Sequence, residues 1–148
     1  MPDKIYAYGV CLYRVEEDQI KILLCKSISS LERWGCLKGV LSKKETPKEC
    51  AKREFFEECS MPISMDDFEE YFEQHNEEKD IGVWLVDANK IRNLNHYIID
   101  DKLLSNYLSW ENSKVKFFSL DELPKIKSKQ QFLIKEIKDF LQSKHQLR

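Results

Sequence analysis

Residues 39–61 read GVLSKKETPKECAKREFFEECSM, and a helix start signal stands in their middle. Thr46 and Glu49 form a T-x-x-E capping box, in which the threonine hydroxyl accepts a hydrogen bond from the amide of Glu49 and the Glu49 carboxylate accepts one from the amide of Thr46. The proline between them occupies the first helical position, where its missing N–H removes no helical hydrogen bond. We therefore expect a helix that runs from this box to about Cys59.

The same helix carries a cluster of carboxylates. Glu54, Glu57 and Glu58 are spaced so that they share one helical face. Like charges at this spacing destabilise a helix by roughly 0.2–0.5 kcal/mol per pair, whereas a divalent cation among them would find the oxygen ligands that Mg²⁺ and Mn²⁺ prefer. Arg53 lies one turn from both Glu49 and Glu57 and can pair with either, while the metal takes the other carboxylates. A solvated acidic helix face is the simpler alternative.

The spacing of these residues resembles the Nudix box, G-x5-E-x7-R-E-U-x-E-E-x-G-U, in which U is a bulky apolar residue. The residues that match are Gly39, Glu45, Arg53, Glu54, Phe55, Glu57, Glu58 and Met61. If each of the fixed glycine and charged positions matched by chance about once in fifteen, the coincidence would occur with a probability of roughly 10⁻⁷ per starting point. Ser60 replaces the second glycine of the box, and it costs on the order of 1 kcal/mol if the turn there needs a positive φ.

The resemblance implies an α/β (α+β) fold, namely a Nudix-type α/β/α sandwich with a central mixed β-sheet, in a single domain over residues 1–148. Alternating apolar residues and turn signals predict its elements. The expected strands are residues 5–15, 20–26, 81–86 and 115–118, the first two forming a hairpin. A second capping box at 128–131 predicts a C-terminal helix to about Lys144. A short helix is expected at 100–108, and residues 66–75 fit either a helix or a strand.

The resemblance also implies roles for the charged residues of the box. Glu57 and Glu58 would be the main metal ligands, and Glu54 would be a further ligand or the general base. Arg53, which is also a candidate catalytic residue, would pair with Glu45 and order the loop before the helix. The cofactor would be Mg²⁺, with Mn²⁺ as the alternative, and it would neutralise the diphosphate and make a bound water easier to deprotonate.

Further metal ligands are expected outside this helix. The backbone carbonyl of Lys38 or Gly39 would complete the coordination. In several family members another acid from a later loop joins the metal or acts as base, and Glu111, four residues before the strand at Val115, is our candidate. Glu111 is equally well explained as a plain loop carboxylate.

Substrate contacts are expected from Lys38, Lys26 and Trp34. Lys26 ends the strand ahead of the box, and Trp34 could stack on a base or belong to the core. Lys38 could neutralise an extra phosphate or be a solvated loop residue. The Lys-Gly pair that it forms with Gly39 resembles subgroups that act on dinucleoside polyphosphates, diphosphoinositol compounds or 5′-capped RNA. Residues 125–148 hold seven Lys/Arg against two acids, so they could contact RNA phosphates or form a solvated helix face.

Composition narrows the class of protein. A chain of 148 residues with 42% hydrophobic residues suits one packed domain and argues against intrinsic disorder. The net charge of -2 excludes a strongly basic nucleic-acid coat protein. Five cysteines without a C-x-x-C pair predict reduced, mostly buried thiols in a cytoplasmic protein. We also expect no membrane span and no secretory signal, because no long apolar run occurs in the sequence.

These observations favour a Mg²⁺-dependent Nudix pyrophosphohydrolase, a hydrolase that cleaves a phosphoric anhydride bond in a nucleoside-diphosphate-linked substrate. A dinucleoside polyphosphate and 5′-phosphorylated or capped RNA are the favoured substrates. One alternative is a housecleaning pyrophosphatase for nucleoside triphosphates. The other is a non-catalytic Nudix-fold nucleotide sensor, although such sensors usually lack one or more of the carboxylates that Glu54, Glu57 and Glu58 supply. A homodimer is also open, because family members are often dimers.

Overall fold

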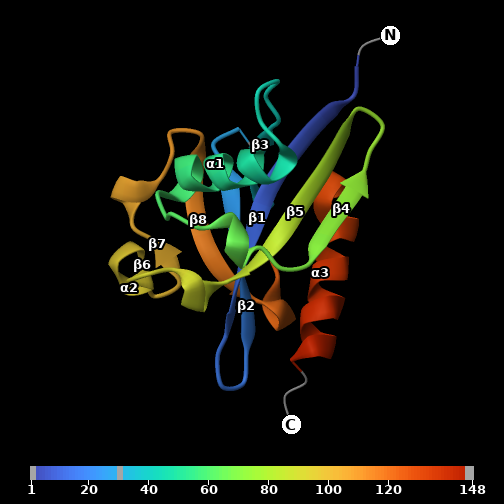
Figure 1. Ribbon diagram of the computed structural model, residues 1–148. Coiled ribbons are helices and arrows are strands. Elements are labelled where there is room, and N and C mark those ends of the chain that lie inside the picture. The colour runs from blue at the N-terminus through green and yellow to red at the C-terminus, as the bar shows by residue number, and fades with distance from the viewer. Residues whose placement is uncertain (1–2, 30–31, 146–148) are drawn as a thin grey trace.

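A mixed β-sheet forms the centre of the molecule (Figure 1). The computed structural model describes residues 3–29 and 32–145. The strands are β1 (Ile5–Val15), β2 (Ile20–Ser27), β3 (Leu37–Val40), β4 (Tyr71–His75), β5 (Lys79–Asp87), β6 (Ile98–Ile99), β7 (Lys102–Leu103) and β8 (Asn112–Ser119). The helices are α1 (Pro47–Cys59), α2 (Leu94–Tyr97) and α3 (Gln131–Lys144), with short 3₁₀ helices η1 (Met65–Asp67), η2 (Ala88–Lys90), η3 (Ser105–Tyr107), η4 (Leu120–Glu122) and η5 (Ser128–Gln130).

The two long helices cover opposite faces of the sheet, because side chains of β1 alternate between them. Val10 and Leu12 belong to a buried cluster that contains Phe55 of α1, whereas Cys11 belongs to a second cluster that contains Ile137 of α3. The described strand order is β4-β5-β1-β2-β8-β7-β6, with β3 paired to β1. Since β1 is parallel to β5 and antiparallel to β2 and β3, the predicted α/β/α sandwich with a mixed sheet is confirmed. No helix in the described ranges is long and apolar enough to cross a membrane.

β3 approaches β1 closely at Gly9. A Cβ atom on Gly9 would lie 2.0 Å from the carbonyl oxygen of Leu37, so any larger residue would push the two strands apart. The register pairs Gly9 with Lys38 and Tyr8 with Gly39. This pairing places the start of the Nudix-like motif on a strand that is held firmly in the sheet.

Helix α1 has the start and the end that the sequence predicts. The Thr46 hydroxyl accepts a hydrogen bond from the Glu49 amide at 3.2 Å, and the Glu49 carboxylate accepts one from the Thr46 amide at 2.8 Å. The helix ends at Cys59, and Ser60 follows with a left-handed φ of 66°. Its amide still donates to the carbonyl of Phe56 at 2.8 Å. The turn therefore needs the conformation that a glycine adopts most readily.

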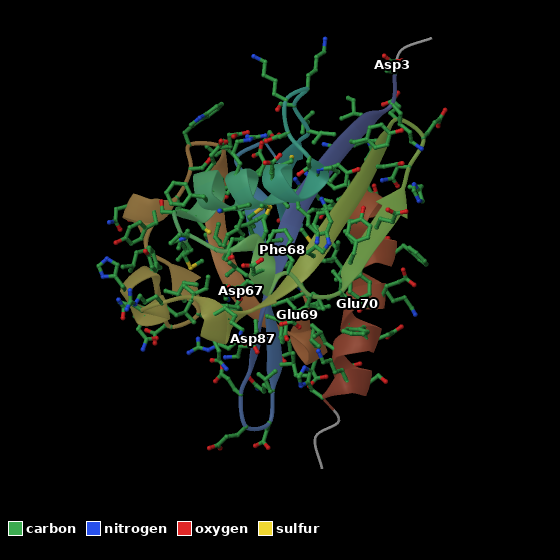
Figure 2. All side chains as sticks on the ribbon, in the orientation of Figure 1. Asp3, Asp67, Phe68, Glu69, Glu70 and Asp87 are labelled. Carbon is green, nitrogen blue, oxygen red and sulfur yellow. The ribbon has the colours of Figure 1, made fainter. Side chains whose placement is uncertain are left out.

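Residues 66–75 contain the end of a short 3₁₀ helix and then a strand. After η1, Glu69 donates its amide to the Leu85 carbonyl at 2.8 Å, and the Glu70 carbonyl accepts from the Leu85 amide at 2.9 Å. Figure 2 shows this segment near Asp87, where β5 ends. The segment continues into β4, which pairs antiparallel with β5 and lies at the edge of the sheet.

The short helix expected at 100–108 was a wrong prediction. Asp100 and Asp101 have φ values of 53° and 68° and form the turn between β6 and β7. The carbonyl of Asp101 accepts a hydrogen bond from the Phe117 amide at 2.8 Å, and its carboxylate accepts one from Lys21 at 2.8 Å. These contacts with distant strands favour a hairpin, which is followed only by the single turn η3.

The C-terminal helix begins at Gln131, and the predicted capping box at Ser128 was wrong. The Gln131 side-chain amide donates to the Ile126 carbonyl at 3.2 Å instead of reaching back to the Ser128 backbone. The neighbouring Gln130 side chain is buried and accepts a hydrogen bond from the Cys36 amide at 2.7 Å. Contacts between distant segments therefore replace the local cap.

We predict that Ser60→Gly raises the free energy of unfolding by about 0.5–1 kcal/mol, because glycine adopts a positive φ without a Cβ penalty. Urea denaturation of the two proteins measures the difference. Ser64→Gly is the matched control, since Ser64 has a φ of -102° and its hydroxyl accepts from the Asp66 amide. The control should be less stable than the wild type by about a few tenths of a kcal/mol, because its cap hydrogen bond is lost. Equal effects of the two changes would contradict strain at Ser60.

Candidate active site

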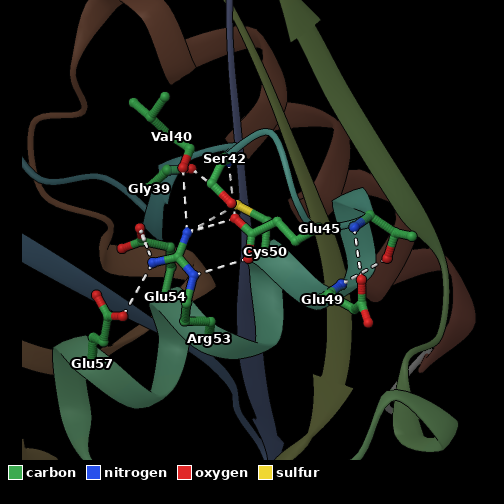
Figure 3. A network of polar contacts seen from close by, with 10 residues as sticks. Gly39, Val40, Ser42, Glu45, Glu49, Cys50, Arg53, Glu54 and Glu57 are labelled. Atoms are coloured by element: carbon green, nitrogen blue, oxygen red, sulfur yellow. Dashed lines mark hydrogen bonds and ion pairs between the residues drawn. The ribbon is translucent and has the colours of Figure 1, made fainter.

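Arg53 of α1 is the centre of a polar network (Figure 3). Its Nε and Nη2 donate to the two carboxylate oxygens of Glu45 at 2.9 and 2.6 Å. Its Nη1 donates to Glu54 at 2.8 Å and to Glu57 at 3.1 Å. The bidentate bond to Arg53 lowers the pKa of Glu45 to about 2. Arg53 therefore orients the carboxylates on both sides of it and ties them to the preceding loop.

The loop before α1 is closed by the same carboxylates. Glu45 also accepts a hydrogen bond from the Ser42 amide at 3.0 Å, so the pair that the motif implies between Glu45 and Arg53 also fixes the loop backbone. Glu49 caps the helix at Thr46, and Figure 3 shows no contact between its carboxylate and Arg53. The expected alternative of a pair between Arg53 and Glu49 was wrong, because the cap already occupies this carboxylate.

The Glu54 carboxylate packs against β3 at Gly39, which has no side chain. A Cβ atom on Gly39 would lie 1.9 Å from the carboxyl carbon of Glu54, so the glycine is what allows this approach. Burial raises the pKa of Glu54, and the bond from Arg53 opposes that rise only in part. A carboxylate with a raised pKa is better suited to accept a proton near neutral pH than an ordinary glutamate.

Glu58 is the most buried acid of the helix, with 8% of its surface exposed. Its Oε1 accepts a hydrogen bond from Asn112 at 3.1 Å and a weaker one from the Cys25 thiol at 3.8 Å. Its Oε2 is buried and has no hydrogen-bond partner in the structure. Burial raises the pKa of Glu58 to about 7. A buried carboxylate oxygen without a partner destabilises the fold, and a bound cation would satisfy it.

Asn112 is a site residue that the sequence analysis missed. It begins β8 and is almost fully buried, with 7% of its surface exposed, beside Glu58. An asparagine at the first position of a strand carries no signal of its own in the sequence. Only the pairing of β2 with β8, which brings Ser27 opposite Asn112, places it near the helix.

The carboxylates of α1 carry the donor atoms that a divalent cation prefers. Glu54, Glu57 and Glu58 supply only oxygen donors, which suit Mg²⁺ or Mn²⁺, and Glu58 offers an unpaired oxygen. Glu57 is the most accessible of the three, with 54% of its side chain exposed. Among residues 3–29 and 32–145 no three acidic, histidine or cysteine side chains converge as a metal site, and Arg53 holds two of these carboxylates.

Glu111, the acid expected from a later loop, influences this site through its charge. Burial is the main cause of the raised pKa values of Glu54 and Glu58, and the charge of Glu111 adds to both. Its role as a further metal ligand or base stays a prediction.

The three residues expected to bind substrate lie around β3 and β2. Lys38 is the neighbour of Gly39 on β3, and its charge lowers the pKa of Glu58, against the larger effect of burial. The Lys26 ammonium lies 5.9 Å from the centre of the Trp34 ring. Trp34 packs edge-on against Phe118 at 4.7 Å and also lines a cavity of about 340 Å³ beside β8. It therefore belongs partly to the core and partly to an open surface.

Comparisons with known proteins match the fold and identify a domain family. The NUDIX domain family model matches residues 4–140. A NUDIX hydrolase from Nitrosomonas europaea superposes with a TM-score of 0.68 at 17% identity, covering 99% of this chain and 74% of that one. A C. elegans Ap4A hydrolase in a binary complex gives 0.61 at 20% identity, covering 94% and 98%. An ADP-ribose pyrophosphatase from Streptococcus suis gives 0.60 at 17% identity, covering 97% and 96%. A comparison with the curated proteins gave no match.

We predict that Glu58→Gln stabilises the metal-free protein at about pH 8. The pKa of Glu58 is about 7 in the fold against an ordinary 4.5. The stability that its protonation contributes is therefore fully present below pH 4.5 and is lost as the pH rises through about 7. The expected gain is on the order of 2 kcal/mol in EDTA. Thermal melts with added Mg²⁺ should show a Tm rise in the wild type and little in the variant. The same Tm rise in both proteins would exclude Glu58 as a ligand.

We predict that Glu45→Gln lowers stability at neutral pH by roughly 1 kcal/mol, because it removes the charge that pairs with Arg53. The loss stays this small because the Arg53 side chain in this pair is partly exposed and solvent screens the pair. The pKa of Glu45 is lowered from 4.5 to about 2, so its contribution is complete above the higher value and disappears as the pH falls through the lower one. Urea titrations at several pH values should show the two proteins converging in acid. A difference that stays constant with pH would contradict the ion pair.

Proposed function

Because the chain belongs to the Nudix family, we propose that it is a hydrolase of phosphoric anhydride bonds, a Mg²⁺-dependent pyrophosphohydrolase that acts on a dinucleoside polyphosphate or on the 5′-phosphorylated or capped end of RNA. The observation that carries this proposal is the buried, unpartnered oxygen of Glu58 beside two further carboxylates of the same helix. Mn²⁺ would suit the same oxygen donors.

The residues of α1 divide the work of such a reaction. Glu57 and Glu58 would hold the metal, which supplies neutralisation of the diphosphate and activation of a water when it is bound. Glu54 is the candidate general base, because burial raises its pKa towards neutrality. Arg53 positions Glu54 and Glu57, and it also anchors the loop through Glu45. Preorganised carboxylates need little movement before the metal and the substrate bind.

The choice of substrate rests on weaker support. The fold is similar to a C. elegans Ap4A hydrolase over nearly the full length of both chains. Lys38 also supplies a positive charge next to Gly39, the residue of β3 that contacts Glu54. Nucleoside triphosphates are the alternative substrates. A non-catalytic sensor is disfavoured, because the three carboxylates are present and one of them is buried without a partner.

Hydrolysis assays with Mg²⁺ test the proposal. The panel contains diadenosine tetraphosphate, 5′-triphosphorylated RNA, a nucleoside triphosphate and ADP-ribose. We expect one class to be cleaved, and we expect Glu57→Gln and Glu58→Gln to lower kcat by about 10²–10⁴-fold, because each removes an oxygen donor for the metal.

Glu136→Gln, an exposed change on α3, is the matched control and should keep the wild-type rate. Loss of activity in the control would show that the assay reports folding rather than metal binding. Cleavage of none of these substrates by wild-type protein that binds Mg²⁺ would contradict the proposal and favour a nucleotide sensor.

A further inference from the structure

Four lysines on three adjacent strands share one face of the sheet, and together they are called the basic strip. Lys26 of β2 lies opposite Lys114 of β8, and Lys102 of β7 lies opposite Lys116 of β8. Residues that are directly opposite on antiparallel strands point to the same face. Leu24, which is also opposite Lys116, belongs to the buried cluster on the α3 face. The basic strip therefore lies on the face of the sheet opposite to α1.

Helix α3 leaves this part of its face uncovered. The Leu133 amide of α3 donates to the Gln74 side chain of β4 at 3.0 Å, and β4 and β7 lie toward opposite edges of the sheet. Figure 1 shows α3 beside β4, with β7 and β8 toward the other edge. Lys102 and Lys114 are accordingly exposed, and the other two lysines of the basic strip are half-buried.

The basic strip carries like charges in directly opposed positions. Two such lysine pairs destabilise the sheet, and in residues 3–29 and 32–145 no lysine of the strip forms an ion pair with a carboxylate. By contrast, two lysines of α3 are paired, Lys135 with Asp139 at 3.1 Å and Lys144 with Glu69 at 3.6 Å. Protection of a sheet edge would explain a lysine on β7. It does not explain lysines on β2, which is an inner strand of the sheet.

Aromatic rings lie among these ammonium groups. The Lys116 Nζ is 5.0 Å from the centre of the Phe118 ring, and the Lys26 Nζ is 5.9 Å from the centre of the Trp34 ring. The two rings meet edge-on with their centres 4.7 Å apart, and both are partly exposed. Proteins that bind single-stranded nucleic acids combine these two groups, because lysines attract the phosphates and rings stack on the bases.

A cavity of about 340 Å³ opens at the basic strip. Three of the four lysines line it together with the rings of Trp34 and Phe118, and its described lining residues include no carboxylate. Cavities that bind small ligands begin at roughly 300 Å³, so this one has room for a single nucleobase. The cavity and the strip therefore offer both an apolar place for a base and positive charge for the phosphates beside it.

We propose that the basic strip and its cavity bind a single-stranded nucleic acid, with backbone phosphates on the lysines and one base against the rings of Trp34 and Phe118. This site lies on the other face of the sheet from the carboxylates of α1. It needs neither a metal nor hydrolysis, so it goes beyond the proposed function.

Fluorescence anisotropy with a short, labelled single-stranded RNA tests the lysines. The RNA carries a 5′-hydroxyl, so it contains no phosphoric anhydride bond, and the buffer contains EDTA. Lys102→Met and Lys114→Met should each weaken binding about fivefold at 0.1 M salt and lower the dependence of log Kd on log salt by about 0.7, because each loses one phosphate contact. Lys90→Met, an exposed change on η2, is the matched control and should bind as the wild type does. No binding by the wild type, or equal binding by all four proteins, would overturn the proposal.

The contribution of the base is tested separately from that of the charge. Phe118→Leu removes a ring but no charge, and it should weaken binding of the single strand about tenfold while binding of inorganic polyphosphate stays unchanged. Thermal melts establish that this variant is folded. Equal losses on RNA and polyphosphate would show that no base occupies the cavity.

The wild type gives a test that requires no variant. It should bind the single strand about tenfold more tightly than a duplex of the same sequence, because the bases of the duplex are already stacked on each other. Equal affinities would overturn the proposal. Since none of these probes can be hydrolysed at a phosphoric anhydride bond except the polyphosphate, and EDTA removes the metal, the RNA results do not depend on whether the proposed function holds.

Discussion

The bidentate ion pair between Arg53 and Glu45 joins the helix of the site to the loop that precedes it. Glu45 also accepts a bond from the Ser42 amide, so one carboxylate fixes both the guanidinium and the loop backbone. The remaining guanidinium N–H groups hold Glu54 and Glu57. A lysine could not do this, because its ammonium lacks the planar fork that presents several donors in fixed directions. The repelling carboxylates are thereby held in defined positions before a cation binds.

The three carboxylates of α1 lie in three different environments, and this difference can give them different tasks. Glu57 is exposed, Glu54 is partly buried against Gly39, and Glu58 is buried with one unpaired oxygen. Desolvation raises the pKa of the two inner acids, because burial disfavours their charged forms when no metal is present. A cation among them reverses this effect, because it favours the charged forms. Metal binding and the stability of the fold are therefore linked.

Local signals in the sequence predicted the parts of the fold that depend on neighbouring residues. The cap at Thr46 and the strand Ile5–Val15 are formed as expected, because capping and alternation act within a few positions. The cap at Ser128 failed because the Gln131 side chain bonds to the Ile126 carbonyl instead of the Ser128 backbone. The spacing within the motif predicted which carboxylates share a face, but it could not show that Glu58 is buried beside Asn112 or that Glu54 packs against Gly39. Those facts depend on which strands pair.

Strand β3 keeps Lys38 apart from the carboxylates of α1. Gly39 brings the strand against Glu54, whereas Lys38 points to the opposite face. The charge of Lys38 lowers the pKa of Glu58, against the larger effect of burial, yet no ion pair forms between Lys38 and Glu54, Glu57 or Glu58 in the described part of the chain. This lysine therefore does not neutralise the carboxylates, and the buried oxygen of Glu58 still lacks a partner. A cation bound there would offset the cost of burying that charge.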